Sequence, residues 1–500
     1  MLPAARTAEK KSGLAYWAQR VLEECDKAAQ DFAPDPVHDL RVAIRRCRSM
    51  ADGFMSVDPD PAWKQMKKLA KPLFSALGEL RDMQVMDEWV QRLSEESDPV
   101  RHTLLDALRS KEDELKAAAQ HALHAFDRKR WSELNLHLAR RTGRVPMEGP
   151  VFQHLALERW IDAYALHRQA MRNRSQTGYH QLRIGIKRFR YTLENFLPQR
   201  HGKWAKDLRD LQDALGEVHD LDVLRAILRA HTAIPPAEVA RWQARITSER
   251  QKRLDLYRQK MLGKDSLWQV WRAELPRGVD LERAAMLKLR TWASFLDPDF
   301  RRTQRVTRLA LQLYDGLAKQ KLAGADPGQR RILEAAAMVH EVGRRKGTNG
   351  HRKRALRLLD KLKPPLGWTA EDLRATGAVA RFHRGALPGQ TSSYFVGVAV
   401  KRRSGLLLLA GILRLANAFD DGNGSQVRSL AVERRDGVLL IYANGLRQPG
   451  PAAERLARAR HLLETTCRLP ILLRPISLPP GRRRRSPAPP ATRKPKRTSA

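Results

Sequence analysis

A long internal repeat is the feature that most constrains the fold of this 500-residue chain. A basic pattern occurs twice with identical spacing, 142 residues apart: His38, Arg41, Arg45, Arg46 and Arg48, then His180, Arg183, Lys187, Arg188 and Arg190. Each copy is followed by a second shared signature, Leu-Gly-Glu-x-x-Asp, at residues 77–82 and 215–220. A repeat of this length indicates two copies of one structural unit, so the basic pattern belongs to the architecture.

The spacing of the basic pattern predicts two helices with one cationic face each. At about 100° per residue, positions 38, 41, 45 and 48 share one side of a helix. The opposite side is apolar in both copies: Leu40, Ala43, Cys47, Met50 and Phe54, then Leu182, Ile186, Phe189, Leu193 and Phe196. Each helix therefore buries one face and presents a row of cations on the other.

The cationic row has two readings. A charged stripe is commonly the solvated face of an amphipathic helix, but such faces usually carry carboxylates at i+3 or i+4. Here only Asp39 and Glu194 lie nearby, too few to neutralise either row. The formal net charge of +38 also indicates an anionic partner such as nucleic acid, polyphosphate or a membrane surface. We therefore favour a polyanion site over a solvated face.

The C-terminal tail accounts for only part of the charge. Residues 476–500 are rich in Pro, Ser, Thr and Ala and contain eight cations with no carboxylate, which predicts a disordered basic tail. The chain has no apolar stretch at its N-terminus, and its longest apolar run, 406–413, is too short for a membrane span. The three cysteines lack metal-ligand spacing. We expect a protein of the cytoplasm with no membrane span; its oligomeric state is open.

Most of the chain has helical periodicity, which predicts an all-α protein. We expect two pseudo-symmetric four-helix bundles in residues 1–275, with repeats of about 1–140 and 150–275. The Leu-Gly-Glu-x-x-Asp signatures are interpreted as turns between helices, for example between 203–216 and 221–231. Pseudo-symmetry would bring the two basic helices together around a cationic groove or pore.

Residues 1–275 resemble the conserved histidine α-helical domain, the CHAD family, on both copies of the basic helix and both Leu-Gly-Glu-x-x-Asp signatures. The resemblance implies paired helical bundles around a basic channel that binds inorganic polyphosphate. The implied ligands are the ten residues of the two basic patterns. The neighbouring helices would extend this surface with Lys64, Lys67 and Lys68 in the first repeat and Lys203, Lys206 and Arg209 in the second.

Residues 280–475 have a different signature. The order His340-Glu341, His351, His383 and Asp420 resembles the HD-type helical region that forms the C-terminal part of Ppx/GppA exopolyphosphatases. Apolar runs on both sides of Asp436-Gly437 predict a small β-hairpin in this domain. Its basic residues form a second predicted polyanion-binding module: Arg344, Arg345, His351, Arg352, Lys353, Arg381, His383 and Arg384. Two modules on one long polymer would raise affinity through avidity.

The same region departs from an active HD metal site. Such a site needs an early His, a His-Asp pair and a late Asp, whereas this chain has Arg302, His340-Glu341 and Asn417. We therefore expect no cofactor and no catalytic residues. The alternative is an exopolyphosphatase-like phosphohydrolase that binds a divalent metal through His340, Glu341, His383 and Asp420.

The sequence as a whole predicts a non-catalytic polyphosphate-binding protein, with polyphosphate granules as a candidate location. Besides the phosphohydrolase, a nonspecific nucleic-acid binder is the other alternative, and the basic tail by itself would bind nucleic acid weakly. Against that alternative, aromatic residues are only 6% of the chain and do not alternate with the basic stripes as stacking platforms would.

Overall fold

The computed structural model describes residues 13–30, 32–324, 326–347, 350–388, 391–420, 427–446 and 451–476. The predicted basic tail lies outside this range from residue 477 onward. The chain divides into two compact units. Unit 1 extends to Leu296 and includes Lys363–Thr369, and unit 2 contains Asp297–Leu362 and continues from Ala370.

Unit 1 is built from the two repeats. The first contains α1 (Leu14–Gln30), α2 (Pro34–Phe54), α3 (Ala62–Leu69), α4 (Lys71–Leu93), α5 (Pro99–His124) and α6 (Arg128–Thr142). The second contains α7 (Pro150–Asn173), α8 (Gln176–Phe196), α9 (Pro198–Ala230), α10 (Pro236–Met261) and α11 (Leu267–Glu274). Corresponding helices have matching lengths: α2 and α8 both have 21 residues, and α5 and α10 both have 26. The helices α6 and α11 were not predicted from the sequence.

The interpretation of Leu-Gly-Glu-x-x-Asp as a turn is wrong. Residues 77–82 lie inside α4, and residues 215–220 lie inside α9, which runs unbroken for 33 residues. In the first repeat the glycine has a packing role instead. A Cβ atom at Gly78 would lie 2.6 Å from an Arg41 guanidinium nitrogen, so the missing side chain makes room for Arg41.

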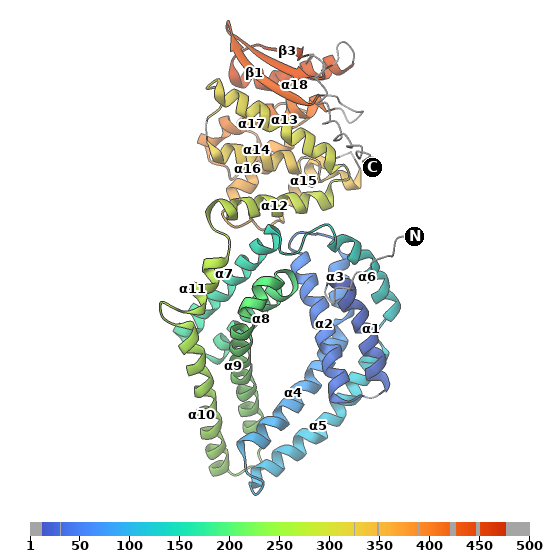
Figure 1. Ribbon diagram of the computed structural model, residues 1–500, viewed down its shortest axis with the longest axis vertical. Helices are drawn as coiled ribbons and strands as arrows, with labels where there is room; N and C mark the ends of the chain where they lie inside the picture. The colour runs from blue at the N-terminus through green and yellow to red at the C-terminus, as the bar shows by residue number, and fades with distance from the viewer. Residues whose placement is uncertain are drawn as a thin grey trace, which may run out of the picture. The chain divides into compact units, whose positions relative to one another are not determined.

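An aromatic cluster joins the two repeats at α2 and α8. Phe54 and Phe196 occupy equivalent repeat positions, and their ring centroids lie 5.4 Å apart. Phe54 also stacks on Trp63, and Phe196 stacks on Phe152. The hairpins α4–α5 and α9–α10 extend away from this cluster and meet again at their far ends (Figure 1). There a second core, with Trp89 and Trp242 among its members, closes the pair of repeats.

Unit 1 extends past the second repeat. The helix α12 (Gly278–Leu296) packs on α7, and Lys288 there donates to both carboxylate oxygens of Glu158 at 2.9 Å. The Leu366 backbone N–H, from the segment Lys363–Thr369, donates to His154 Nε2 at 3.0 Å. The division between the two compact units falls at residue 297, whereas the domains expected from the sequence are 1–275 and 280–475.

Unit 2 is a helical domain with one small sheet. Its helices are α13 (Phe300–Lys319), α14 (Pro327–Val339), η1 (Arg344–Lys346), α15 (His351–Asp360), α16 (Ala370–Arg381), η2 (Ser393–Phe395), α17 (Val400–Phe419) and α18 (Pro451–Cys467). The strands are β1 (Ser429–Arg435), β2 (Val438–Asn444) and β3 (Ile471–Ile476), in the order β1-β2-β3.

The predicted hairpin is present. Arg435 pairs with Val438 across a two-residue turn in which Asp436 and Gly437 both have positive φ, as a type I′ turn requires. The third strand, β3, pairs parallel to β2 after the connecting helix α18 and was not predicted. The predominantly helical fold class is confirmed. In the described part of the chain, no helix combines the length and apolar character that a membrane span requires.

Candidate functional site

The basic stripes of the two repeats lie close enough to influence each other electrostatically. Burial lowers the pKa of Arg41, and the neighbouring guanidinium groups of Arg45 and Arg183 lower it further. Burial lowers the pKa of Arg46 on α2, the Glu194 carboxylate opposes this shift, and the guanidinium of Arg190 on α8 adds to it. Because α2 and α8 join at the aromatic cluster, their cationic faces are held near each other. Tertiary packing thus combines two rows of cations into one site.

Most of these cations have no carboxylate partner. Among the residues that the structure describes, Arg41, Arg45, Arg48, Arg183, Lys187, Arg188 and Arg190 form no ion pair with Asp or Glu. Aromatic rings support several of them instead: Arg41 and Arg48 lie over Phe74, and Arg45 lies over Tyr191. The Nε atoms of Arg45, Arg183 and Arg190 are buried without a hydrogen-bond partner. Uncompensated guanidinium groups at this density favour binding of a polyanion.

A cavity of about 480 Å³ opens along the two helices. Its cationic lining comes from Arg45 and Arg48 on α2, Lys187 and Arg188 on α8, and Lys67 and Arg159 from neighbouring helices. Tyr191, Ser49 and Thr192 add hydroxyl groups, and Asp52 is the one carboxylate among the lining residues. This volume is sufficient for several phosphate-sized groups rather than for one ion.

Lys187 shows the electrostatic character of the site most clearly. Burial and the cations Arg183, Arg45 and Arg41 lower its pKa from 10.5 to about 7. The Asp220 carboxylate opposes this shift, and burial raises the pKa of Asp220 itself to about 6. The free site therefore contains a lysine that is only partly charged at neutral pH, which an added anion would recharge.

Each histidine of the repeated pattern lies in a different environment. His38 is exposed on α2. His180 packs against His219 of α9, with 3.3 Å between their Nδ1 atoms. Burial, with Arg183, His180 and Lys187 nearby, lowers the pKa of His219 to about 4, so this imidazole stays neutral at physiological pH. The equivalence of the two histidines in sequence does not extend to their surroundings.

Other predicted ligands are distributed around the site. Arg46 forms an ion pair with Glu194 and donates to Asn195 Oδ1 at 3.2 Å, which links α2 to α8. Lys67 pairs with Asp52 at the edge of the cavity. Lys203 lies 3.6 Å from Glu274. The remaining predicted lysines and arginine are exposed on α3 and α9: Lys64, Lys68, Lys206 and Arg209.

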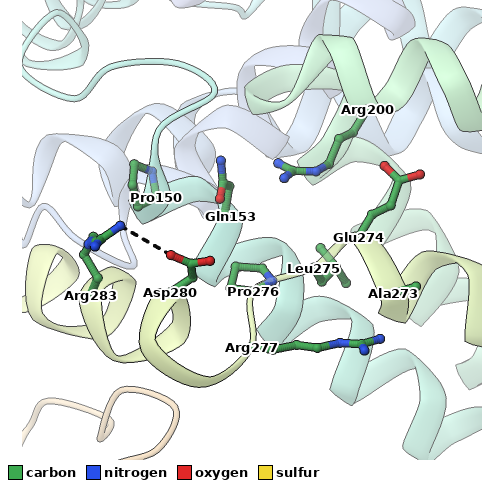
Figure 2. A pocket seen from close by; sticks show the side chains of 10 residues that line it. All are labelled: Pro150, Gln153, Arg200, Ala273, Glu274, Leu275, Pro276, Arg277, Asp280 and Arg283. Atoms are coloured by element: carbon green, nitrogen blue, oxygen red, sulfur yellow. Dashed lines mark hydrogen bonds and ion pairs between the residues drawn. The ribbon is translucent and has the colours of Figure 1, made fainter.

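A second cavity in unit 1, of about 490 Å³, has a different charge pattern (Figure 2). It lies between the start of α7, the start of α9 and the α11–α12 connection. Arg200, Arg277 and Arg283 line it together with Glu274 and Asp280, and Arg283 lies 3.3 Å from Asp280. Its mixed charge makes it a weaker candidate for a polyanion than the cavity at α2 and α8.

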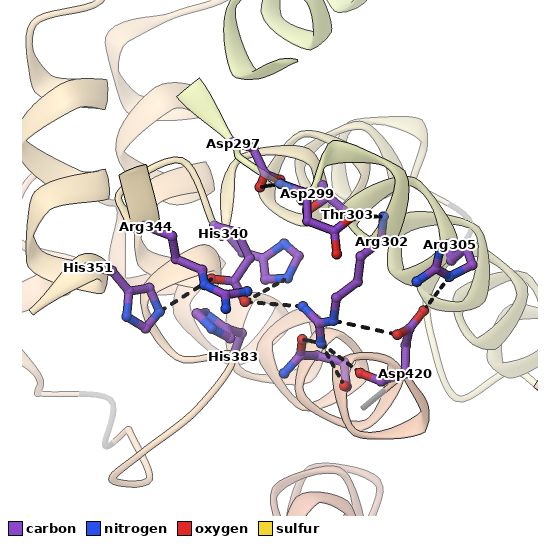
Figure 3. A network of polar contacts seen from close by, with 12 residues as sticks. Asp297, Asp299, Arg302, Thr303, Arg305, His340, Arg344, His351, His383 and Asp420 are labelled. Carbon is purple, nitrogen blue, oxygen red and sulfur yellow. Dashed lines mark hydrogen bonds and ion pairs between the residues drawn. The ribbon is translucent and has the colours of Figure 1, made fainter. Parts of the chain in front are cut away.

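In unit 2 the predicted metal ligands surround a guanidinium group. Arg302 is buried and contacts Glu341 at 3.2 Å, the Asn417 side-chain oxygen at 2.7 Å and the Asp420 backbone oxygen at 2.7 Å (Figure 3). The Asp420 carboxylate is also 2.7 Å from Arg305 Nε. Arg302 therefore contacts Glu341 of the His-Glu pair and Asn417, which stands where an active HD site would have its late Asp. The four-ligand set of the phosphohydrolase alternative does not assemble, because Asp420 is held by arginines.

The predicted second module does not form one continuous basic surface. Arg344 lies 3.7 Å from Glu341, Arg352 donates to the Arg384 carbonyl oxygen, and Arg381 stacks over Tyr394. Arg345, Lys353 and Arg384 are exposed. His351 and His383 lie beside Glu341, and His383 is completely buried, away from the surface that a polymer would contact.

Comparison with known proteins identifies both parts of the chain. Residues 14–229 match the family model for the CHAD domain. This chain carries a CHAD domain. Residues 289–436 match the family model for Ppx/GppA phosphatase, domain III, so both resemblances predicted from the sequence are confirmed. The CHAD domain contains both basic helices, and domain III contains Arg302 and its partners.

Solved structures include a match to the CHAD domain. The crystal structure of the CHAD domain from the plant Ricinus communis is 21% identical to this chain, covers 52% of this chain and 88% of its own, and has a TM-score of 0.35. Curated proteins gave no match.

Several residues of the site were missed from the sequence. Tyr191 and His219 contact the basic stripes, and Asp82 and Asp220 lie within electrostatic range of Arg41 and Arg183. The signal for the two aspartates was available, since each ends a Leu-Gly-Glu-x-x-Asp signature. Reading that signature as a turn concealed its position on a helix facing the cations.

Proposed function

We propose that the CHAD domain of this protein binds inorganic polyphosphate between α2 and α8 and does not hydrolyse it. One observation carries the proposal: seven cations from two repeats have no carboxylate partner among the described residues, and four of them line one cavity: Arg45, Arg48, Lys187 and Arg188. A flexible chain of phosphates offers many non-bridging oxygens to such a double row, and each guanidinium can bind two of them.

The family relationship supports the same ligand. CHAD domains bind polyphosphate, and domain III belongs by description to Ppx/GppA phosphatases. Counterion release would make the affinity high and sensitive to salt. We further propose that the protein works in the cytoplasm, at polyphosphate granules where the polymer accumulates.

A competition titration tests this function against nonspecific nucleic-acid binding. Fluorescent long-chain polyphosphate bound to the full chain is titrated with unlabelled polyphosphate, DNA or RNA near physiological salt, and each competitor's concentration is expressed as phosphate. We expect polyphosphate to compete at much lower concentration than either nucleic acid. Equal competition by all three would mean a general cationic surface and would overturn the proposal.

Charge reversal locates the binding site. Arg41→Glu with Arg183→Glu should weaken polyphosphate binding by roughly 100-fold or more, since it removes one central cation from each repeat. The control is Lys111→Glu with Lys252→Glu, which makes the same change in net charge on the exposed surfaces of α5 and α10. The basic tail is common to both variants, so a similar loss in both would place binding outside α2 and α8.

A further inference from the structure

We propose that Glu341, His351 and His383 of unit 2 form a binding site for a transition-metal ion such as Zn²⁺. One potential ligand atom from each of these side chains lies within 4.8 Å of the other two. This set differs from the one expected from the sequence, because His351 replaces Asp420. It is independent of the polyphosphate site in the CHAD domain.

Hydrogen bonds fix the imidazole of His383 in a form that can bind a metal. Its Nδ1 donates to the Ala380 carbonyl oxygen at 2.7 Å, which leaves the lone pair on Nε2. The ring is completely buried, and Nε2 has no hydrogen-bond partner among the described residues. A buried polar atom without a partner is costly, and a bound metal would satisfy it.

His340 repeats the arrangement beside it. Its Nδ1 donates to the Ala337 carbonyl oxygen at 2.7 Å, and its ring centroid lies 4.9 Å from that of His383. His340 therefore supports the packing of His383 and extends the nitrogen-rich wall of the site.

Gly343 allows the third ligand to approach. A Cβ atom at this position would lie only 2.0 Å from the His351 carbonyl oxygen, so only glycine lets the start of α15 pack this closely. His351 Nε2 consequently lies 3.5 Å from Glu341 Oε2. Arg302 binds the other oxygen, Oε1, which orients the carboxylate with Oε2 toward the histidines. Figure 3 shows His351 and His383 on the side of this network away from Asp420.

The ligand chemistry selects the type of metal. Two imidazoles and one carboxylate suit Zn²⁺, Co²⁺ or Ni²⁺ and leave an open coordination position, whereas Mg²⁺ and Ca²⁺ prefer oxygen ligands. Positive charge nearby, from Arg302, Arg344 and Arg384, opposes a cation and so limits its affinity. The same arginines favour an anion, such as a terminal phosphate, as the fourth ligand.

Cobalt titration of the untagged, metal-free full chain tests the site. We expect one Co²⁺ per chain, visible d–d absorption typical of tetrahedral coordination, and displacement by Zn²⁺ but not by Mg²⁺. His351→Asn and His383→Gln should each weaken binding by at least about 10-fold. The control is His461→Asn, which changes an exposed histidine of α18 and should leave binding unchanged.

Two results would overturn the metal site. The first is no saturable Co²⁺ binding by the unmodified protein. The second is binding that His351→Asn leaves unaltered, which would place the ion elsewhere. His351 is partly exposed, so this variant should fold and can decide the question even if His383→Gln does not. The thermal unfolding temperature of each metal-free variant provides the check on folding.

Discussion

The CHAD domain and domain III treat buried positive charge in opposite ways. In the CHAD domain, Arg41, Arg45 and Lys187 lie near other cations and have no carboxylate partner among the described residues. In domain III, Arg302 is more deeply buried, and its guanidinium contacts Glu341, Asn417 and Asp420. Both regions are rich in arginine, so composition alone does not distinguish them.

The difference separates a ligand site from a structural core. Neighbouring cations without counterions raise the free energy of the folded protein, and an added polyanion relieves that repulsion. A guanidinium already saturated by carboxylates gains nothing from an added anion, and its removal leaves buried negative charge. Substitutions in the two regions should therefore have effects of opposite sign on stability.

The largest expected effect is loss of stability in domain III on Arg302→Ala. This change leaves Glu341 and Asp420 without their main buried partner and should lower the free energy of unfolding by about 3–5 kcal/mol. Chemical denaturation followed by circular dichroism would measure it. Arg308→Ala, an exposed arginine on the same helix, is the control and should change stability little. A small effect of Arg302→Ala would mean that this guanidinium is not structural.

An opposite effect is expected at Lys187 in the CHAD domain. Lys187→Met removes a positive charge that burial and neighbouring cations make unfavourable. Without polyphosphate, the free energy of unfolding should therefore increase by roughly 1–3 kcal/mol below pH 7. The unfolded chain keeps the lysine proton up to its ordinary pKa of 10.5, whereas the folded protein releases it near pH 7. The stability of the unmodified protein therefore rises between these pH values, and the advantage of the variant shrinks.

The second quantity to measure on Lys187→Met is its affinity for polyphosphate. The variant should bind polyphosphate about 10-fold more weakly, because one cation of the cavity is lost. Denaturation curves across pH 6–10, with and without polyphosphate, would measure both quantities. If Lys187→Met were less stable than the native protein and bound polyphosphate with unchanged affinity, the contrast drawn between the CHAD domain and domain III would be wrong.

The smallest expected effect concerns Asp220. Its pKa of about 6 means that this carboxyl is ionised at pH 7.5, where it partly neutralises Arg183 and Lys187 and repels a polyanion. Asp220→Asn should therefore tighten polyphosphate binding by about 3–10-fold at pH 7.5 and have little effect at pH 5, where the native carboxyl is already protonated. Affinity measured across this pH range would show it. If the polyphosphate affinity of Asp220→Asn changed with pH as strongly as that of the native protein, the pH dependence would come from other titrating groups.

The sequence by itself determined the elements whose signals are local. Helical periodicity predicted the basic faces of α2 and α8, and the residues 436–437 predicted the hairpin between β1 and β2, because both depend on residues a few positions apart. Local patterns failed at α9, where Gly216 sits inside a continuous helix that tertiary packing stabilises. The helices α6 and α11 were also missed, although the buried residues of α6, Trp131, Leu134 and Leu138, recur at helical spacing.

Only the tertiary structure decided which charges are paired. Arg46 belongs to the repeated basic pattern, yet it binds Glu194, 148 residues away, while Arg45 beside it has no carboxylate partner in the described residues. Arg302 meets Asn417 and Asp420 across 115 and 118 residues, and His351 reaches Glu341 because Gly343 lets the backbone approach. Ion pairing depends on distances of a few ångströms between side chains brought together by packing, and spacing along the chain does not encode those distances.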